Sequence, residues 1–233
     1  LPLVEAGYRV IAYDRRGHGH SDQPWNGYDY DTLADDLAAV IEGLDLKDAA
    51  IFGFSMGGGE VVRYMSRHEG RRVVKAGLIA SIAPGLIKGP QNPDGADADL
   101  FEGMMAGLRK DRAQFIKEFL PGFYGQGTDG GGVSDGILHW SWKLALQASA
   151  RATIECVRAF GLTDFTDEMG ALARAELQVI HGTGDVTVPI DITARRVKKL
   201  VPAAELIEYD GAPHGLLATH AEKVAADMLA FLK

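Results

Sequence analysis

The chain has 233 residues, of which 46% are hydrophobic, and this is enough to fill the core of one α/β domain with an insertion. A formal net charge of −8 argues against a nucleic-acid partner, because a phosphate-binding face needs an excess of basic residues. The single cysteine, Cys156, excludes an internal disulfide, and no apolar run approaches the length of a membrane span.

Strands and helices are predicted to alternate over the first part of the chain. Residues Arg9–Tyr13 have the pattern of a strand, and a helix over Asp31–Gly43 and a strand over Ala49–Phe54 follow. A second helix then runs to about Arg67, and another strand covers Val73–Ile82. This alternation indicates an α/β fold with a mostly parallel sheet that is covered by helices on both faces.

The strand over Ala49–Phe54 ends in the pattern G-x-S-x-G, with Ser55 at its centre. The pattern is typical of a nucleophile elbow, in which a sharp turn from strand to helix lifts a serine hydroxyl clear of the sheet. We expect a β-carbon at either Gly53 or Gly57 to collide with the neighbouring strand or helix. The alternative is a serine in a structural glycine-rich turn, because the pattern arises by chance about 0.1 times in such a chain.

The alternation stops between about Pro84 and Ala175, where helical segments and glycine-rich loops dominate. We interpret this region as a helical cap inserted over the site, which divides the chain into residues 1–83, 84–175 and 176–233. Within it, Gly125–Gly130 matches the dinucleotide fingerprint G-x-G-x-x-G, but no strand precedes the match and more glycine follows it. A mobile surface loop, whose motion could gate substrate entry, is the prediction for this segment.

Two further strands are predicted after the cap, each followed by a polar loop. Leu177–His181 reads as a buried strand, and Asp185 follows it in a glycine-containing turn. Leu206–Tyr209 reads as the next strand and leads into the loop that contains His214. An amphipathic helix from about residue 221 to residue 232 ends the chain. Asp185 therefore lies just beyond a strand end, where parallel sheets place functional groups.

Ser55, Asp185 and His214 follow one another in the order of the α/β-hydrolase triad. Asp210 competes for the role of the acid, but it lies only four residues before His214 and would leave the better placed Asp185 unexplained. Asp185 has an alternative role as a helix N-cap, and His181 reads as a strand-end histidine.

Further motifs resemble the cofactor-free haloperoxidase and aryl esterase family of α/β-hydrolases. They lie at residues 13–25, 27–31, 53–59, 110–115, 123–125, 163–165 and 212–215, so the resemblance covers essentially the whole chain. It implies a serine esterase without metal, haem or other cofactor, acting on small aryl or short-chain esters. Many members of that family also make peracids from acetate and hydrogen peroxide, which can oxidise halide. Oligomeric assembly is common in the family, and a cytoplasmic location is expected.

The triad pattern predicts a two-step acyl transfer. Ser55 attacks the ester carbonyl, His214 takes the serine proton, and Asp185 orients the imidazole. The Met56 N–H is the expected oxyanion donor, while the family's second donor comes from a His-Gly loop that nothing in this sequence matches. By resemblance, four residues should line the substrate pocket, although packing between cap and core would explain them equally well: Phe123, Phe160, Thr187 and Ile190.

The resemblance also concerns the start of the chain. Residues 1–7 look like the end of the family's first helix, and family members carry three strands before it. One of these lies between the segments Arg9–Tyr13 and Ala49–Phe54, so we expect either two rows of unpaired backbone groups or direct pairing of the two segments. There are two alternatives to a complete esterase. One is a truncated chain, whose native N-terminus could carry a signal peptide, and the other is a non-catalytic binding protein on the same fold. Dehalogenases and epoxide hydrolases need a carboxylate where Ser55 stands.

Overall fold

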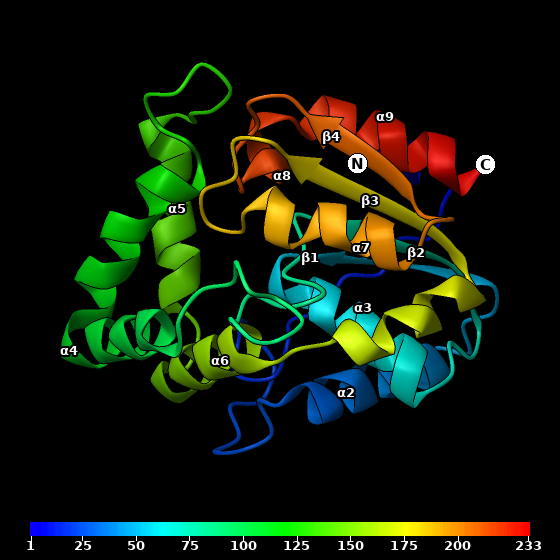
Figure 1. Ribbon diagram of the computed structural model, residues 1–233, viewed down its shortest axis with the longest axis horizontal. Coiled ribbons are helices and arrows are strands. Elements are labelled where there is room, and N and C mark those ends of the chain that lie inside the picture. Colours follow the sequence, from blue (N-terminus) through cyan, green and yellow to red (C-terminus); the bar gives the residue numbers. More distant parts are fainter.

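The computed structural model describes all 233 residues and contains one parallel four-stranded sheet. Its strands pair in chain order, β1 to β2 to β3 to β4 (Figure 1). They span Ala49–Phe54, Val73–Ile79, Glu176–Gly182 and Glu205–Tyr209. The predicted parallel sheet is therefore confirmed. The prediction that β2 continues to Ile82 is wrong, because Ala80 adopts a φ of 43° and turns the chain out of the strand.

Helices cover both faces of this sheet (Figure 1). Those outside the cap are α1 (Pro2–Glu5), α2 (Tyr30–Gly43), α3 (Met56–Arg67), α7 (Ala194–Leu200), α8 (Leu216–Thr219) and α9 (Ala221–Leu232), with the short 3-10 helix η2 (Ile190–Ile192); a second 3-10 helix, η1 (Thr166–Arg174), ends the region predicted as a cap. The larger hydrophobic core contains buried side chains of α2, α3 and α7 and continues into the cap. A smaller cluster lies on the other face, where Ile180 and Tyr209 pack against Val224 of α9.

Three helices make up most of the region predicted as a cap. They are α4 (Ala98–Phe123), α5 (Asp135–Leu146) and α6 (Ala150–Leu162), and they stand beside the sheet in Figure 1. Within α4 the backbone leaves helical geometry at Asp111, whose carboxylate accepts the Gln114 N–H and so caps the second half. Serine side chains cap α5 and α6 in the same way. The helical character of this region is thus confirmed, and the three-part division of the chain stays a prediction.

The predicted strand over Arg9–Tyr13 is not formed. Val10 and Ile11 have the β-branched character of a strand, but a strand also needs a neighbour that accepts and donates its backbone hydrogen bonds. No such bond joins this segment to β1, and Val10 is 48% exposed. The direct pairing of the two segments, which we gave as one alternative, is therefore also absent.

A groove of about 910 Å³ separates the segment from the sheet. Residues 8–15 line one side of it and all six residues of β1 line the other. β1 pairs with β2 along one edge only, so its second edge faces this groove. The strand that ends at the nucleophile elbow is consequently an edge strand.

No helix of the structure combines the length and the apolar character that crossing a membrane requires.

Candidate active site

Ser55 lies at the turn between β1 and α3, as the elbow pattern predicts. Its φ of 53° is a left-handed backbone conformation that non-glycine residues rarely adopt. The conformation is held from β2, because the Ser55 N–H donates to the Ile79 carbonyl at 2.9 Å. The turn thereby presents the hydroxyl beyond the carboxyl ends of the strands, where an open parallel sheet places its ligands.

The two glycines of the pattern differ in what they contact. A β-carbon on Gly53 would lie 2.2 Å from the Gly57 carbonyl oxygen, so the expected collision is confirmed at this position. The expectation for Gly57 is wrong, because its β-carbon would meet only the Arg15 guanidinium at 3.7 Å. The close approach on the helix side involves the next residue, Gly58, which packs against the side chain of Ser81.

We expect Gly53→Ala to lower the free energy of unfolding by about 2–3 kcal/mol, because a backbone carbonyl cannot move aside as a flexible side chain can. Gly43→Ala is the matched control: it lies at the end of α2 with nothing within 4 Å of the added carbon. This control should be neutral or more stable by up to about 1 kcal/mol. Urea unfolding followed by circular dichroism measures both, and a Gly53→Ala variant as stable as the wild type would contradict the prediction.

The predicted Ser55, Asp185 and His214 come together in one hydrogen-bonded row. His214 Nε2 lies 2.8 Å from Ser55 Oγ, and His214 Nδ1 lies 2.7 Å from Asp185 Oδ2. An ionised carboxylate can only accept, so Nδ1 carries the imidazole proton and the Nε2 lone pair faces the serine hydroxyl. Asp185 and His214 are buried, whereas Ser55 is half-buried and remains reachable. This arrangement can remove the proton of an attacking hydroxyl.

Asp185 sits in a turn whose donors stabilise its charge; we call residues 182–188 the acid turn. Its Oδ1 accepts the N–H groups of Thr187 at 2.9 Å and Val188 at 2.7 Å. Burial alone would raise the pKa of this carboxyl, but the imidazoles of His181 and His214 and the Val188 N–H outweigh it, so the pKa lies below its usual range. His181 lies one residue before the end of β3, close to its predicted place, and its Nε2 contacts the Val188 carbonyl at 2.8 Å. Asp185 therefore stays ionised near neutral pH.

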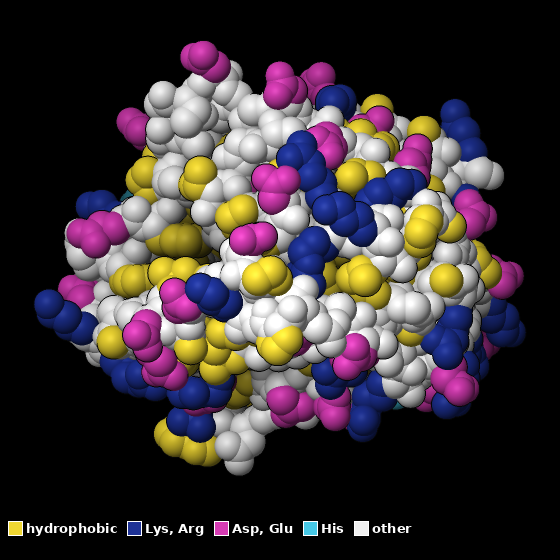
Figure 2. Space-filling model, viewed as in Figure 1, with side chains coloured by type: hydrophobic (Ala, Val, Ile, Leu, Met, Phe, Trp, Pro, Cys, Tyr) yellow, Lys and Arg dark blue, Asp and Glu magenta, His cyan; other side chains and the backbone are white.

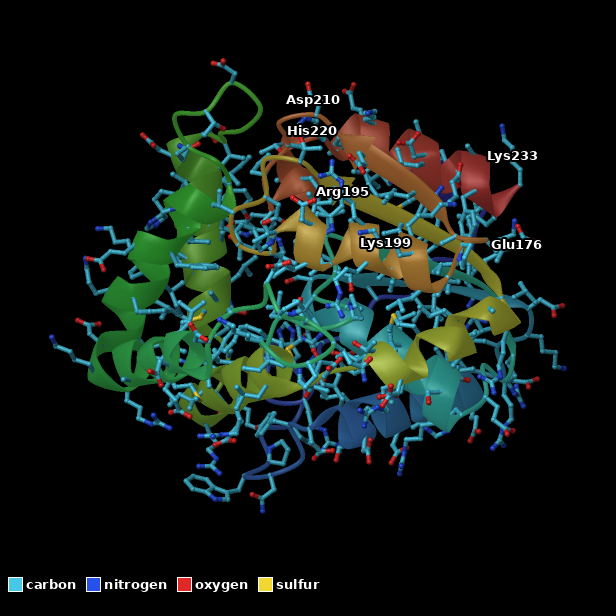
Figure 3. All side chains as sticks on the ribbon, viewed as in Figure 1. Glu176, Arg195, Lys199, Asp210, His220 and Lys233 are labelled. Carbon is cyan, nitrogen blue, oxygen red and sulfur yellow. The ribbon has the colours of Figure 1, made fainter.

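The competing carboxylate, Asp210, is not in contact with His214. It begins the loop of residues 210–215, which we call the base loop, and its Oδ1 accepts a hydrogen bond from Thr183 Oγ1 at 3.3 Å. Figure 3 places Asp210 at the upper edge of the molecule, beyond the end of β4. The geometry thus favours Asp185 as the acid.

Met56 is the first residue of α3, so its N–H, which is the predicted oxyanion donor, has no hydrogen-bond acceptor within that helix. The carbonyl of the same peptide, that of Ser55, accepts the N–H groups of Gly58 at 3.0 Å and Ile82 at 3.3 Å. Bonds to the carbonyl polarise a peptide and strengthen its N–H as a donor. A helix N-terminus adds a positive potential at the same place. Ser55 Oγ therefore lies beside a group suited to an oxyanion.

The predicted pocket residues are dispersed. Phe123, at the end of α4, packs edge-on against the His214 ring with centroids 4.9 Å apart, and Phe54 packs on the same ring at 5.2 Å. Phe160 contacts Phe101 within the cap, and Ile190 is buried in the larger core. Of the four predicted residues, Phe123 contacts the triad through its side chain and Thr187 through its backbone.

The glycine-rich loop of the cap lies against the base loop. A β-carbon on Gly130 would stand 2.1 Å from the Gly211 carbonyl oxygen, and one on Gly125 would stand 2.9 Å from Pro213. Because α4 and no strand precedes the loop, the dinucleotide pattern has no support in the fold. Mobility and gating of the loop stay predictions.

Neither the one cysteine nor a cluster of metal-binding side chains offers a second reactive site. Burial raises the pKa of the Cys156 thiol to about 11, so the thiolate that a nucleophile requires is not formed near neutral pH. Nor does any group of three or more His, Cys, Asp or Glu side chains have an arrangement that could hold a metal ion.

Tyr30 and Thr183 support the site but were missed in the sequence. The Tyr30 hydroxyl donates to the Met56 carbonyl at 3.0 Å, and Thr183 Oγ1 accepts the Gly211 N–H at 2.8 Å. Thr183 stands between two glycines directly before Asp185, and a hydroxyl in a turn is a signal for such a bond. For Tyr30 the sequence gives no signal of its hydrogen bond; the residue only belongs to the motif of residues 27–31 that resembles the family.

Comparisons with known proteins show what the chain is similar to. The chain is 46% identical over 237 residues to a non-heme chloroperoxidase of Streptomyces lividans, covering 100% of this chain and 84% of the relative. It is 41% identical to a bifunctional esterase/perhydrolase of Acinetobacter calcoaceticus, with the same coverage. The crystal structure of a bromoperoxidase from Bacillus anthracis superposes with a TM-score of 0.94 at 40% identity, over 99% of this chain and 84% of that one. The model of the alpha/beta hydrolase fold matches residues 1–221, and the chain belongs to this family.

Proposed function

We propose that the protein is a serine esterase that hydrolyses small aryl or short-chain carboxylic esters through an acyl-enzyme. The observation that carries this proposal is the row of hydrogen bonds from Ser55 Oγ through His214 to Asp185, with contacts of 2.8 Å and 2.7 Å. Both lie within the reach that nucleophile activation requires. The names of relatives that are at least 40% identical, an esterase/perhydrolase among them, support the same reaction class.

In the first step, Ser55 Oγ forms a bond to the ester carbonyl carbon while His214 Nε2 takes the hydroxyl proton. Asp185 stabilises the imidazolium that results. The negative charge on the carbonyl oxygen is directed to the Met56 N–H at the start of α3. When the tetrahedral intermediate collapses, the alkoxide or phenoxide leaves and His214 returns the proton to it.

In the second step, water or hydrogen peroxide attacks the acyl-enzyme. His214 removes a proton from the attacking oxygen and delivers it to Ser55 Oγ, which leaves as the free hydroxyl. Water gives a carboxylic acid, and hydrogen peroxide gives a peracid. The peracid branch is supported by the relatives, which include proteins named as chloroperoxidases and as an esterase/perhydrolase.

An apolar acyl or aryl group suits the surroundings of the site. The rings of Phe54, Phe123 and His214 pack against one another, with centroids 4.9 to 6.2 Å apart, and the two phenyl rings shield the proposed base from water. Figure 2 shows a hollow with hydrophobic side chains on its walls between the cap helices and the rest of the molecule. Pocket roles for Phe160, Thr187 and Ile190 remain part of the proposal, as do acetate and hydrogen peroxide as partners.

A fluorophosphonate probe tests the nucleophile directly, because it phosphonylates serines that an adjacent base activates. We expect one equivalent to add at Ser55, as peptide mass spectrometry would show, with parallel loss of p-nitrophenyl acetate hydrolysis. Circular dichroism on the same sample establishes that the protein is folded. A folded protein that neither reacts nor turns over substrate would overturn the proposal and favour a binding protein on a hydrolase fold.

A further inference from the structure

The acid turn and the base loop continue the pairing of β3 and β4 beyond the strand ends. Regular pairing ends where Gly182 stands opposite Tyr209. After that, the Thr183 N–H donates to the Tyr209 carbonyl at 2.9 Å and the Gly184 N–H to the Ala212 carbonyl at 3.1 Å. The two segments that carry the acid and the base therefore leave the sheet side by side.

The Thr183 hydroxyl bridges these segments. It accepts the Gly211 N–H at 2.8 Å and donates to Asp210 Oδ1 at 3.3 Å. Apart from the bond between His214 and Asp185 itself, these are the side-chain hydrogen bonds that join the acid turn to the base loop. A threonine two residues before the acid thus holds a peptide three residues before the base.

The backbones around this bridge are close enough to transmit a displacement. A β-carbon on Gly184 would lie 2.4 Å from the Gly211 carbonyl oxygen, and one on Gly182 would lie 2.0 Å from that of Ala212. Gly130 of the cap approaches the Gly211 carbonyl from another segment. Gly211 itself has a φ of 66°, in the left-handed region that glycine adopts without steric cost. Movement of Gly211 therefore carries over to His214.

We propose that Thr183 is a positioning residue for the catalytic pair: its hydroxyl fixes the base loop so that His214 meets Asp185 and Ser55 at the same time. The proposal rests on the esterase function proposed above. It does not require Thr183 to touch the substrate. His214 has to satisfy two contacts, of 2.7 Å and 2.8 Å, on opposite sides of one ring. A shift of about 1 Å in such an arrangement costs on the order of a hundredfold in rate.

Thr183→Val and Thr183→Ser form the test pair, because valine keeps the branched shape without the hydroxyl and serine keeps the hydroxyl. Each is assayed with p-nitrophenyl acetate, and the concentration of competent sites is titrated with the fluorophosphonate probe. For Thr183→Val we expect kcat per titrated site to fall by about ten- to a hundredfold, with KM within about twofold of the wild type. Thr183→Ser should stay within about threefold in kcat, since the bridge to Gly211 is kept.

A purely structural threonine would behave differently. It would lower stability and the number of competent sites but leave kcat per site unchanged, so that result overturns the proposal. An equal loss in Thr183→Ser overturns it too, because the hydroxyl would then be irrelevant. If Thr183→Val unfolds under assay conditions, Thr183→Ala removes the same hydroxyl and should show the same fall.

Two controls distinguish this proposal from a role for Asp210 and from failure of the esterase function itself. Asp210→Ala removes the longer bond of the bridge but keeps the bond to Gly211, and its kcat should stay within about threefold of the wild type. A loss as large as that of Thr183→Val would transfer the role to Asp210 and overturn the proposal. A wild type without turnover dependent on Ser55 overturns the esterase function and this inference with it, whereas an active wild type with an unaffected Thr183→Val overturns this inference alone.

Discussion

Replacing Ser55 with alanine is expected to lower kcat for p-nitrophenyl acetate by about 10⁶-fold, to the background rate of the buffer. The reason is that no other group at this position can form the acyl-enzyme. His214 and Asp185 remain hydrogen-bonded in the variant, but they then have no hydroxyl to activate. The measurement is release of p-nitrophenol, with circular dichroism on the same sample to establish folding.

Ser66→Ala is the matched control for this variant, because it makes the same change within α3, the helix that begins directly after Ser55. It should retain wild-type activity, and alanine favours the helix slightly. If Ser55→Ala kept more than about a tenth of the wild-type turnover, another group would have to be the nucleophile. The fluorophosphonate adduct on the wild type would then also lie elsewhere.

Asp185→Asn is expected to lower kcat by about 10⁴-fold while KM changes little. The amide has the shape of the carboxylate, but its NH2 group can face His214 Nδ1 as a donor. Nδ1 then accepts, so the proton moves to Nε2, and the lone pair that should receive the Ser55 proton is lost. The effect acts on transition-state formation and leaves substrate binding unchanged, so it should appear in kcat.

The same substitution at Asp210 distinguishes the two candidate acids. Asp210→Asn keeps an oxygen for Thr183 Oγ1 and lies outside the contacts of His214, so its kcat should remain within about threefold of the wild type. A large loss at Asp210 together with a small one at Asp185 would reverse the assignment. Losses of similar size at both positions would mean that the base loop moves as a whole.

The elements that the sequence predicts best are those whose signals are local. Both β1 and α9 begin and end within a residue of their expected positions, because each has a hydrophobic pattern bounded by turn residues. The elbow helix α3 ends at Arg67 as expected. Ser55 is identified by its own motif, while Asp185 and His214 follow from their places after strand ends. The hydrogen-bonded row of these three residues could therefore be predicted, although they lie far apart in the chain.

The failures concern features that depend on distant parts of the chain. Residues 9–13 have β-propensity, but whether they form a strand depends on a neighbour, which no local pattern reveals. Gly57 was expected to be sterically required, yet the close approach on the helix side is that of Gly58 to the Ser81 side chain, in the turn after β2. The bridge from Thr183 to Gly211 spans 28 residues and involves one backbone group, so neither residue shows its partner in the sequence. Of the residues that the resemblance suggests for the substrate pocket, Phe123 packs against the His214 ring and Ile190 lies in the core, and their pocket roles stay predictions.

The edge position of β1 has a consequence for solvent access to the elbow. Ala49 and Ser55 direct their N–H groups to Arg72 and Ile79, and N–H directions alternate along a strand. The amides of Phe52 and Phe54 therefore point into the groove, where they have no backbone partner. We therefore expect the rate of hydrogen exchange along β1 to alternate with a period of two residues, slow at Ser55 and fast at Phe54. The Ser55 amide belongs to the protected set, so amides on the free edge of β1 can exchange while Ser55 stays hydrogen-bonded to β2.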